Sequence, residues 1–119
     1  MKHAPRYTEE TTLNRWGIHA WLEALVTDRD RHCVYCGADF SVSPSRRGDR
    51  PSWEHIINDA RIITPENIAR CCISCNASKG AKELRDWLGS KYCQRNGVGP
   101  AIVSDVVRVA LERASPCSR

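Results

Sequence analysis

The chain has 119 residues, the length of one small domain, and its 41% hydrophobic and 27% charged content argues against long disordered segments. Eighteen Lys and Arg against 14 Asp and Glu give a formal net charge of +4, which is compatible with a polyanionic partner without requiring one. No apolar run is long enough to span a bilayer and the first residues lack the apolar centre of a signal peptide, so a cytoplasmic protein without membrane attachment is expected.

The first predicted element is an amphipathic helix over about residues 9–27. Leucine, isoleucine and tryptophan recur there at three- and four-residue spacing, which is the period of a helix with one buried face. Trp16, Trp21 and Leu25 are expected to form the core side of this helix.

A cysteine pair follows the helix. Cys33 and Cys36 are separated by two residues, and Gly37 after them permits the tight turn that lets both sulfurs face one ion. The next segment, residues 41–52, is rich in turn residues and predicts an exposed basic loop. Its arginines are Arg46, Arg47 and Arg50.

The middle of the chain predicts two short strands and a helix. Residues 53–57 have the aromatic and β-branched content of a strand, and residues 61–63 are expected to pair with them. A helix is predicted over 76–88, where Gly80 is expected to allow close approach of another backbone. Residues 101–114 predict a last helix, although their valines leave a strand open.

The spacing of the cysteines predicts a structural metal site. Seven cysteines are an odd total, which suits a disulfide framework poorly, and paired C-x-x-C spacing in a reducing compartment indicates metal binding. Two such pairs give four thiolate ligands for one tetrahedral zinc ion. The expected ligands are Cys33, Cys36, Cys72 and Cys75. Cys71 is an alternative to Cys72, which is preferred because it keeps the two-residue spacing.

Further polar residues lie between and after these pairs. Glu54-His55 stands in the predicted strand, Asn67 lies between the strand and the second cysteine pair, and Asn76 follows Cys75 directly, with Lys79 one helical turn later. In this order the parts resemble the HNH endonuclease family over roughly residues 31–88. The resemblance implies a small α+β protein, with a zinc-stapled ββα-metal core flanked by N-terminal and C-terminal helices in a single domain, residues 1–119.

The resemblance also implies a role for each residue. His55 would be the general base that activates water, and Asn67 would brace the loop that orients it. Glu54 and Asn76 would hold a catalytic divalent cation, Mg²⁺ or another, beside a structural Zn²⁺. Adjacent residues of a regular strand face opposite sides, so Glu54 and His55 can share a site only where the strand is distorted or ends.

The implied activity is metal-dependent hydrolysis of phosphodiester bonds in DNA, with double-stranded DNA as the expected partner. A histidine near its natural pKa can activate water at neutral pH, and a hard cation can stabilise the phosphate charge. The expected DNA-contacting residues are Arg46, Arg47, Arg50, Lys79, Lys82 and Arg85. The alternatives are a non-catalytic zinc module that binds nucleic acid or protein, and a dithiol redox protein, which would not explain the Glu-His-Asn set.

Overall fold

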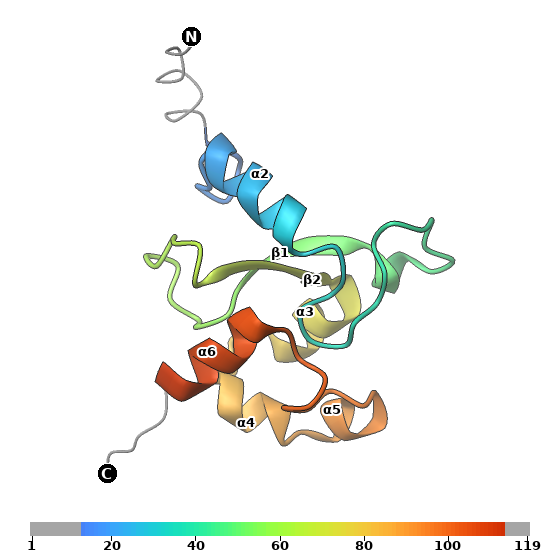
Figure 1. The fold of residues 1–119 in the computed structure, drawn as a ribbon. Helices are drawn as coiled ribbons and strands as arrows, with labels where there is room; N and C mark the ends of the chain where they lie inside the picture. Colours follow the sequence, from blue (N-terminus) through green and yellow to red (C-terminus); the bar gives the residue numbers. More distant parts are fainter. Residues whose placement is uncertain (1–12, 114–119) are drawn as a thin grey trace, which may run out of the picture.

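The computed structural model describes residues 13–113. Its centre is an antiparallel pair of strands, β1 (Pro51–His55) and β2 (Ile68–Cys72), and helix α3 (Ile73–Lys79) follows β2 without a connecting loop. Helix α2 (Ala20–Arg29) lies on one side of the sheet, and α3 lies on the other side together with the C-terminal helices (Figure 1). The fold is therefore a small α+β arrangement, as expected.

The strand register separates the side chains into two layers. Trp53 pairs with Arg70, while Glu54 pairs with Ala69, and successive residues point to opposite faces of the sheet. Trp53 packs against the apolar cluster under α2, which contains Leu22 and Val26. Ala69 belongs instead to the larger cluster on the α3 side.

The larger cluster contains the cysteine knuckle and the C-terminal helices. The Trp87 ring of α4 (Leu84–Leu88) packs edge-on against Tyr35, with 4.8 Å between ring centroids, and stacks on Tyr92 of α5 (Lys91–Arg95) at 6.0 Å. The last helix, α6 (Asp105–Arg113), contributes Val107 to the same cluster. The sequence left helix or strand open here, and the structure has a helix.

The N-terminal helix is shorter than the sequence predicted. The described part of the predicted span, residues 13–19, forms a turn closed by a bridge between Leu13 and His19, and α2 begins only at Ala20. The Asn14 side chain causes this, because its Oδ1 accepts hydrogen bonds from the backbone of Trp16 (2.8 Å) and Ile18 (3.0 Å). An asparagine that captures backbone N–H groups in this way competes with the helix. The earlier part of the predicted helix lies outside the described residues.

The expected core residues of this segment are also wrong. Trp16, Trp21 and Leu25 are 49%, 44% and 42% exposed, and the buried positions are Ile18, Leu22 and Val26. In α2 the buried residues Leu22 and Val26 each lie one position after the predicted core residues Trp21 and Leu25.

The second predicted strand is displaced along the chain. Residues 61–63 belong to a turn, in which Asp59 accepts hydrogen bonds from the backbone of Arg61 and Ile62, both at 3.0 Å. The partner of β1 is instead residues 68–72. This strand includes Cys71 and Cys72, which had been considered only as possible ligands.

Gly80 divides the helix predicted over 76–88 into α3 and α4. Its φ of +50° and ψ of −128° lie in a region that residues with a Cβ rarely adopt. An added Cβ would meet nothing closer than the Ala77 carbonyl at 3.8 Å. Backbone conformation rather than close approach thus explains this glycine.

Replacing Gly80 with alanine should lower the free energy of unfolding by about 1–3 kcal/mol, because the native φ and ψ become strained. The matched control is Gly89→Ala, at the end of α4, where φ is −90° and the added Cβ would have only an ordinary contact at 3.6 Å. Urea unfolding of both variants measures the difference. Equal losses would contradict the conformational explanation.

Candidate functional site

The first cysteine pair lies in a tight knuckle between α2 and the basic loop. The Cys33 N–H donates to the Ala38 carbonyl at 2.8 Å, and the Gly37 N–H donates to the Cys33 carbonyl at 3.0 Å. Gly37 has φ of +83°, the conformation for which a glycine was expected here. The turn directs the sulfurs of Cys33 and Cys36 toward the junction of β2 and α3.

The second cysteine pair is positioned by that junction. Cys72 is the last residue of β2 and the N-cap of α3, and its sulfur accepts a hydrogen bond from the Cys75 N–H at 3.4 Å. The sulfurs of the four predicted ligands all lie within 4.8 Å of one another, so the cluster can hold a zinc ion. Tetrahedral Zn–S bonds place sulfurs about 3.8 Å apart, and Cys36 and Cys72 are separated by 3.8 Å.

The structure also decides between Cys71 and Cys72. Cys71 is fully buried, and it lies on the face of β2 opposite to that of Cys72. The Cys71 sulfur is 3.9 Å from the Ser52 hydroxyl. Adjacent strand residues face opposite sides, so only Cys72 can meet the first cysteine pair. Cys72, and not Cys71, therefore lies in the four-cysteine cluster.

The cysteine thiols of the cluster shift one another's pKa values through hydrogen bonds. Hydrogen bonds from Cys33, then Cys72 and Cys75, lower the pKa of Cys36, while hydrogen bonds with Cys33 and Cys36 raise the pKa of Cys72. Zinc binding would displace the protons held by these thiols.

One further contact to the sulfurs was not foreseen. The Tyr92 hydroxyl of α5 donates to the Cys75 sulfur at 3.3 Å, and burial raises the pKa of this tyrosine. Hydrogen bonds to ligand atoms orient them and tune a metal site. Tyr92 follows Cys75 by seventeen residues, and nothing in the sequence pattern signals the contact.

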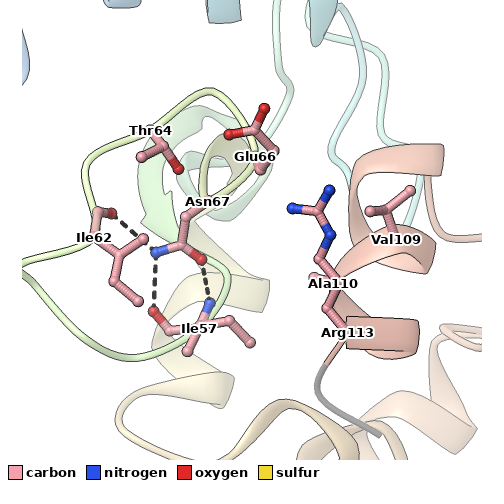
Figure 2. A pocket seen from close by; sticks show the side chains of 8 residues that line it. All are labelled: Ile57, Ile62, Thr64, Glu66, Asn67, Val109, Ala110 and Arg113. Atoms are coloured by element: carbon pink, nitrogen blue, oxygen red, sulfur yellow. Dashed lines mark hydrogen bonds between the residues drawn. The ribbon is translucent and has the colours of Figure 1, made fainter.

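Asn67 fixes the loop between β1 and β2 (Figure 2). Its side-chain oxygen accepts from the Ile57 N–H at 2.7 Å, and its nitrogen donates to the carbonyls of Ile57 and Ile62, both at 3.1 Å. The residue is 3% exposed, so these bonds are shielded from water. This bracing of the segment directly after His55 is the role that the resemblance implied for Asn67.

The predicted metal ligand Glu54 lies in a buried polar contact on the α3 side of the sheet. Its Oε2 accepts from the Tyr35 hydroxyl at 2.6 Å and lies 2.9 Å from the Lys79 Nζ. The Lys79 Nζ also donates to the His55 carbonyl at 3.3 Å. Burial and then the Glu54 charge raise the pKa of Tyr35, so its hydroxyl stays protonated and donates.

This contact corrects the expectation for Lys79. A lysine that meets the DNA backbone must be exposed, but the Lys79 side chain is 1% exposed and paired with a carboxylate. Its charge compensates Glu54 inside the protein. Tyr35, which stands between the cysteines of the first pair, is the residue of this group that the sequence analysis did not single out.

Asn76 contacts β1 from α3, whereas His55 is the last residue of β1 itself. The Asn76 side-chain nitrogen donates to the Ser52 hydroxyl and to the Trp53 carbonyl, both at 2.9 Å, so α3 is fastened to β1 beside Glu54. His55 pairs with Ile68 of β2, so the strand pairing continues to the end of β1. Its Nε2 is buried and has no hydrogen-bond partner among the residues of 13–113.

The other five basic residues expected to contact DNA are exposed, and they lie in different parts of the structure. Arg46, Arg47 and Arg50 lie on or beside the short 3-10 helix η1 (Arg47–Asp49), where Arg46 is bound to Asp49 at 3.0 Å. Lys82 follows Gly80, and Arg85 donates to the Leu111 carbonyl of α6 at 3.0 Å. Their contact with DNA stays a prediction.

Comparison of the chain with models of known protein families, with curated proteins and with solved structures found no match in any of the three. Among residues 13–113, every helix is too short or too polar to cross a membrane.

Replacing Cys72 with serine should abolish zinc binding and unfold the protein, because three remaining thiolates leave the ion one ligand short. Cys71→Ser is the matched control, since Cys71 is buried but turned away from the cluster. Elemental analysis per chain, with circular dichroism, measures both effects. Retention of zinc by Cys72→Ser, together with its loss from Cys71→Ser, would reverse the ligand assignment.

Replacing Lys79 with methionine should lower the free energy of unfolding by about 3–5 kcal/mol, because the buried Glu54 carboxylate then has no cation beside it. Lys82→Met is the matched control, since Lys82 is exposed three residues further along and donates only to the Ser78 carbonyl. Urea unfolding of the zinc-loaded proteins gives the comparison. Similar midpoints for the two variants would show that the Glu54–Lys79 pair contributes nothing.

Proposed function

We propose that the protein is a metal-dependent DNA endonuclease of the HNH type, built on a structural zinc site formed by the four clustered cysteines. The observation that carries the proposal is the bracing of the segment after His55 by the three side-chain hydrogen bonds of Asn67. A general base acts only when its ring is held within reach of the proton that it abstracts. The Asn67 contacts fix the backbone at Ile57, two residues after His55 ends β1.

His55 is the base in this proposal. A buried polar atom without a partner costs about 1–3 kcal/mol, and a catalytic role is one of the reasons for which native structures keep such an atom. The His55 Nε2 is such an atom. Because it is shielded from solvent here, the imidazole must turn outward to accept a proton from water at a bound phosphodiester.

Glu54 and Asn76 offer oxygen atoms for a divalent cation. Oε1 of Glu54 and Oδ1 of Asn76 accept no hydrogen bond from any described residue, and α3 holds Asn76 against β1. Carboxylate and amide oxygens are ligands that suit Mg²⁺ and similar ions. When bound, such a cation supplies charge stabilisation for the phosphate and for the leaving oxygen.

One observation favours a second function, a non-catalytic zinc module that binds nucleic acid or protein. The Lys79 ammonium lies 2.9 Å from the Glu54 Oε2 and compensates the charge that a divalent cation would need. In the nuclease, Glu54 must bind the ion through Oε1 or release Lys79. In the binding module the pair is permanent and structural.

Replacing His55 with alanine should lower the rate of plasmid cleavage in Mg²⁺ or Mn²⁺ by about 100- to 10,000-fold, the usual contribution of a general base. His32→Ala is the matched control, because His32 is exposed and its imidazole lies 3.9 Å from the Asp39 carboxylate, beyond hydrogen-bond distance. Gel analysis of nicked and linear plasmid gives the rates, and zinc content shows that each variant is folded.

Each of two outcomes would contradict part of the proposal. Cleavage by His55→Ala at the parent rate would show that His55 is not the general base, while the nuclease activity itself would stand. No cleavage by the zinc-loaded parent protein in either metal, combined with retained DNA binding, would leave the binding module as the function.

A further inference from the structure

A concave surface beside α3 is lined by two tryptophans that come from separate segments. It has a volume of about 370 Å³, and its walls include Trp16, Pro51, Trp53, Arg70 and Asn76. We call it the aromatic pocket. Asn76 belongs both to this pocket and to the proposed active site, so the two are contiguous.

Trp16 is held in the wall of the pocket although it is exposed. The Asn14 side chain accepts a hydrogen bond from the Trp16 N–H, and its nitrogen donates to Glu23 of α2 at 2.8 Å. The Leu13–His19 bridge closes the same turn. The Trp16 indole on this turn is 49% exposed, so its apolar surface is accessible from solvent.

Guanidinium groups accompany both tryptophans. Arg15 lies over the Trp16 ring at 4.5 Å from its centroid. Arg70 lies 5.5 Å from the Phe40 centroid and 5.6 Å from the Trp53 centroid, so it is held between two aromatic rings. Flat aromatic and guanidinium groups together form the kind of surface on which nucleobases stack.

The charge around the pocket suits a polyanion. Arg50 directly precedes Pro51 of the pocket wall, and its carbonyl accepts from the first residue of α3 at 2.9 Å. Arg46 and Arg47 stand on the same exposed loop. Cationic side chains beside aromatic ones are typical of grooves that follow a single-stranded backbone.

We propose that the aromatic pocket binds an unpaired nucleobase of the DNA strand, so that the preferred substrate carries a single-stranded segment beside the scissile phosphate. Bases inside a duplex are paired and stacked, and their faces cannot reach a protein indole unless the base leaves the helix. The inference rests on the proposed nuclease function and refines the expectation of double-stranded DNA.

The test compares two tryptophans of similar exposure. Trp16 lines the pocket, whereas Trp21, at 44% exposure on α2, does not. Trp16→Ala and Trp21→Ala are measured by fluorescence anisotropy, without added divalent metal, on a labelled oligothymidine of about 20 nucleotides and on a blunt duplex of equal length. Trp16→Phe tests whether another aromatic ring restores binding.

The expected result is selective. Trp16→Ala should weaken binding to the single strand by about 5- to 150-fold, the range for one stacked base, and leave duplex binding nearly unchanged. Trp16→Phe should recover most of the loss, and Trp21→Ala should match the parent. No effect of Trp16→Ala, or equal losses on single strand and duplex, would overturn the pocket assignment. Duplex binding and cleavage with no effect at Trp16 would leave the nuclease standing, whereas no binding to either DNA would refute both.

Discussion

The convergence of four sulfurs is the constraint on which the rest of the structure depends. Thirty-five residues separate Cys36 from Cys72, and bringing the ends of such a segment together costs chain entropy that a small core offsets only in part. A zinc ion in the cluster would supply folding free energy at this point. The segment that it would close contains β1, the braced loop and β2, so every candidate active-site residue except Asn76 lies within the closed loop or at its ends.

The position of Cys72 links the cysteine cluster to the geometry of the candidate active site. The residue ends β2, caps α3 and belongs to the cysteine cluster, so strand, helix and cluster share one residue. Asn76 in the first turn of α3 and Lys79 at its last residue both contact β1, at positions set by this cap. The geometry around Glu54 is thus a consequence of where the sulfurs meet.

The sequence predicted features that depend on local spacing better than features that depend on packing. Two-residue spacing identified the cysteine cluster, and Gly37 has the positive φ expected of it. The side chain of Asn14 replaced helical hydrogen bonds at residues 13–19, and a hydrophobic period cannot reveal such a capture. From the sequence, Lys79 is expected at the surface. Its three-residue spacing from Asn76 does not show which strand residue its side chain contacts. The Glu54–Lys79 pair arises only when α3 lies across β1.

The sheet divides the apolar core into two layers, and this division affects how the protein unfolds locally. Apolar contacts of Ile68 and Trp53 join the layer under α2 to the sheet. Polar contacts add to them: Arg29 donates to the carbonyls of Pro65 and Ile68 at 2.6 and 2.8 Å, and Asp30 accepts from the Arg70 N–H at 3.1 Å. Cysteines and stacked aromatic rings hold the other layer. Regions with fewer buried apolar contacts open at lower free energy. The amide protons of α2 should therefore exchange with solvent water in a separate, earlier unit, while those of β2 and α3 exchange only when the cysteine cluster itself comes apart.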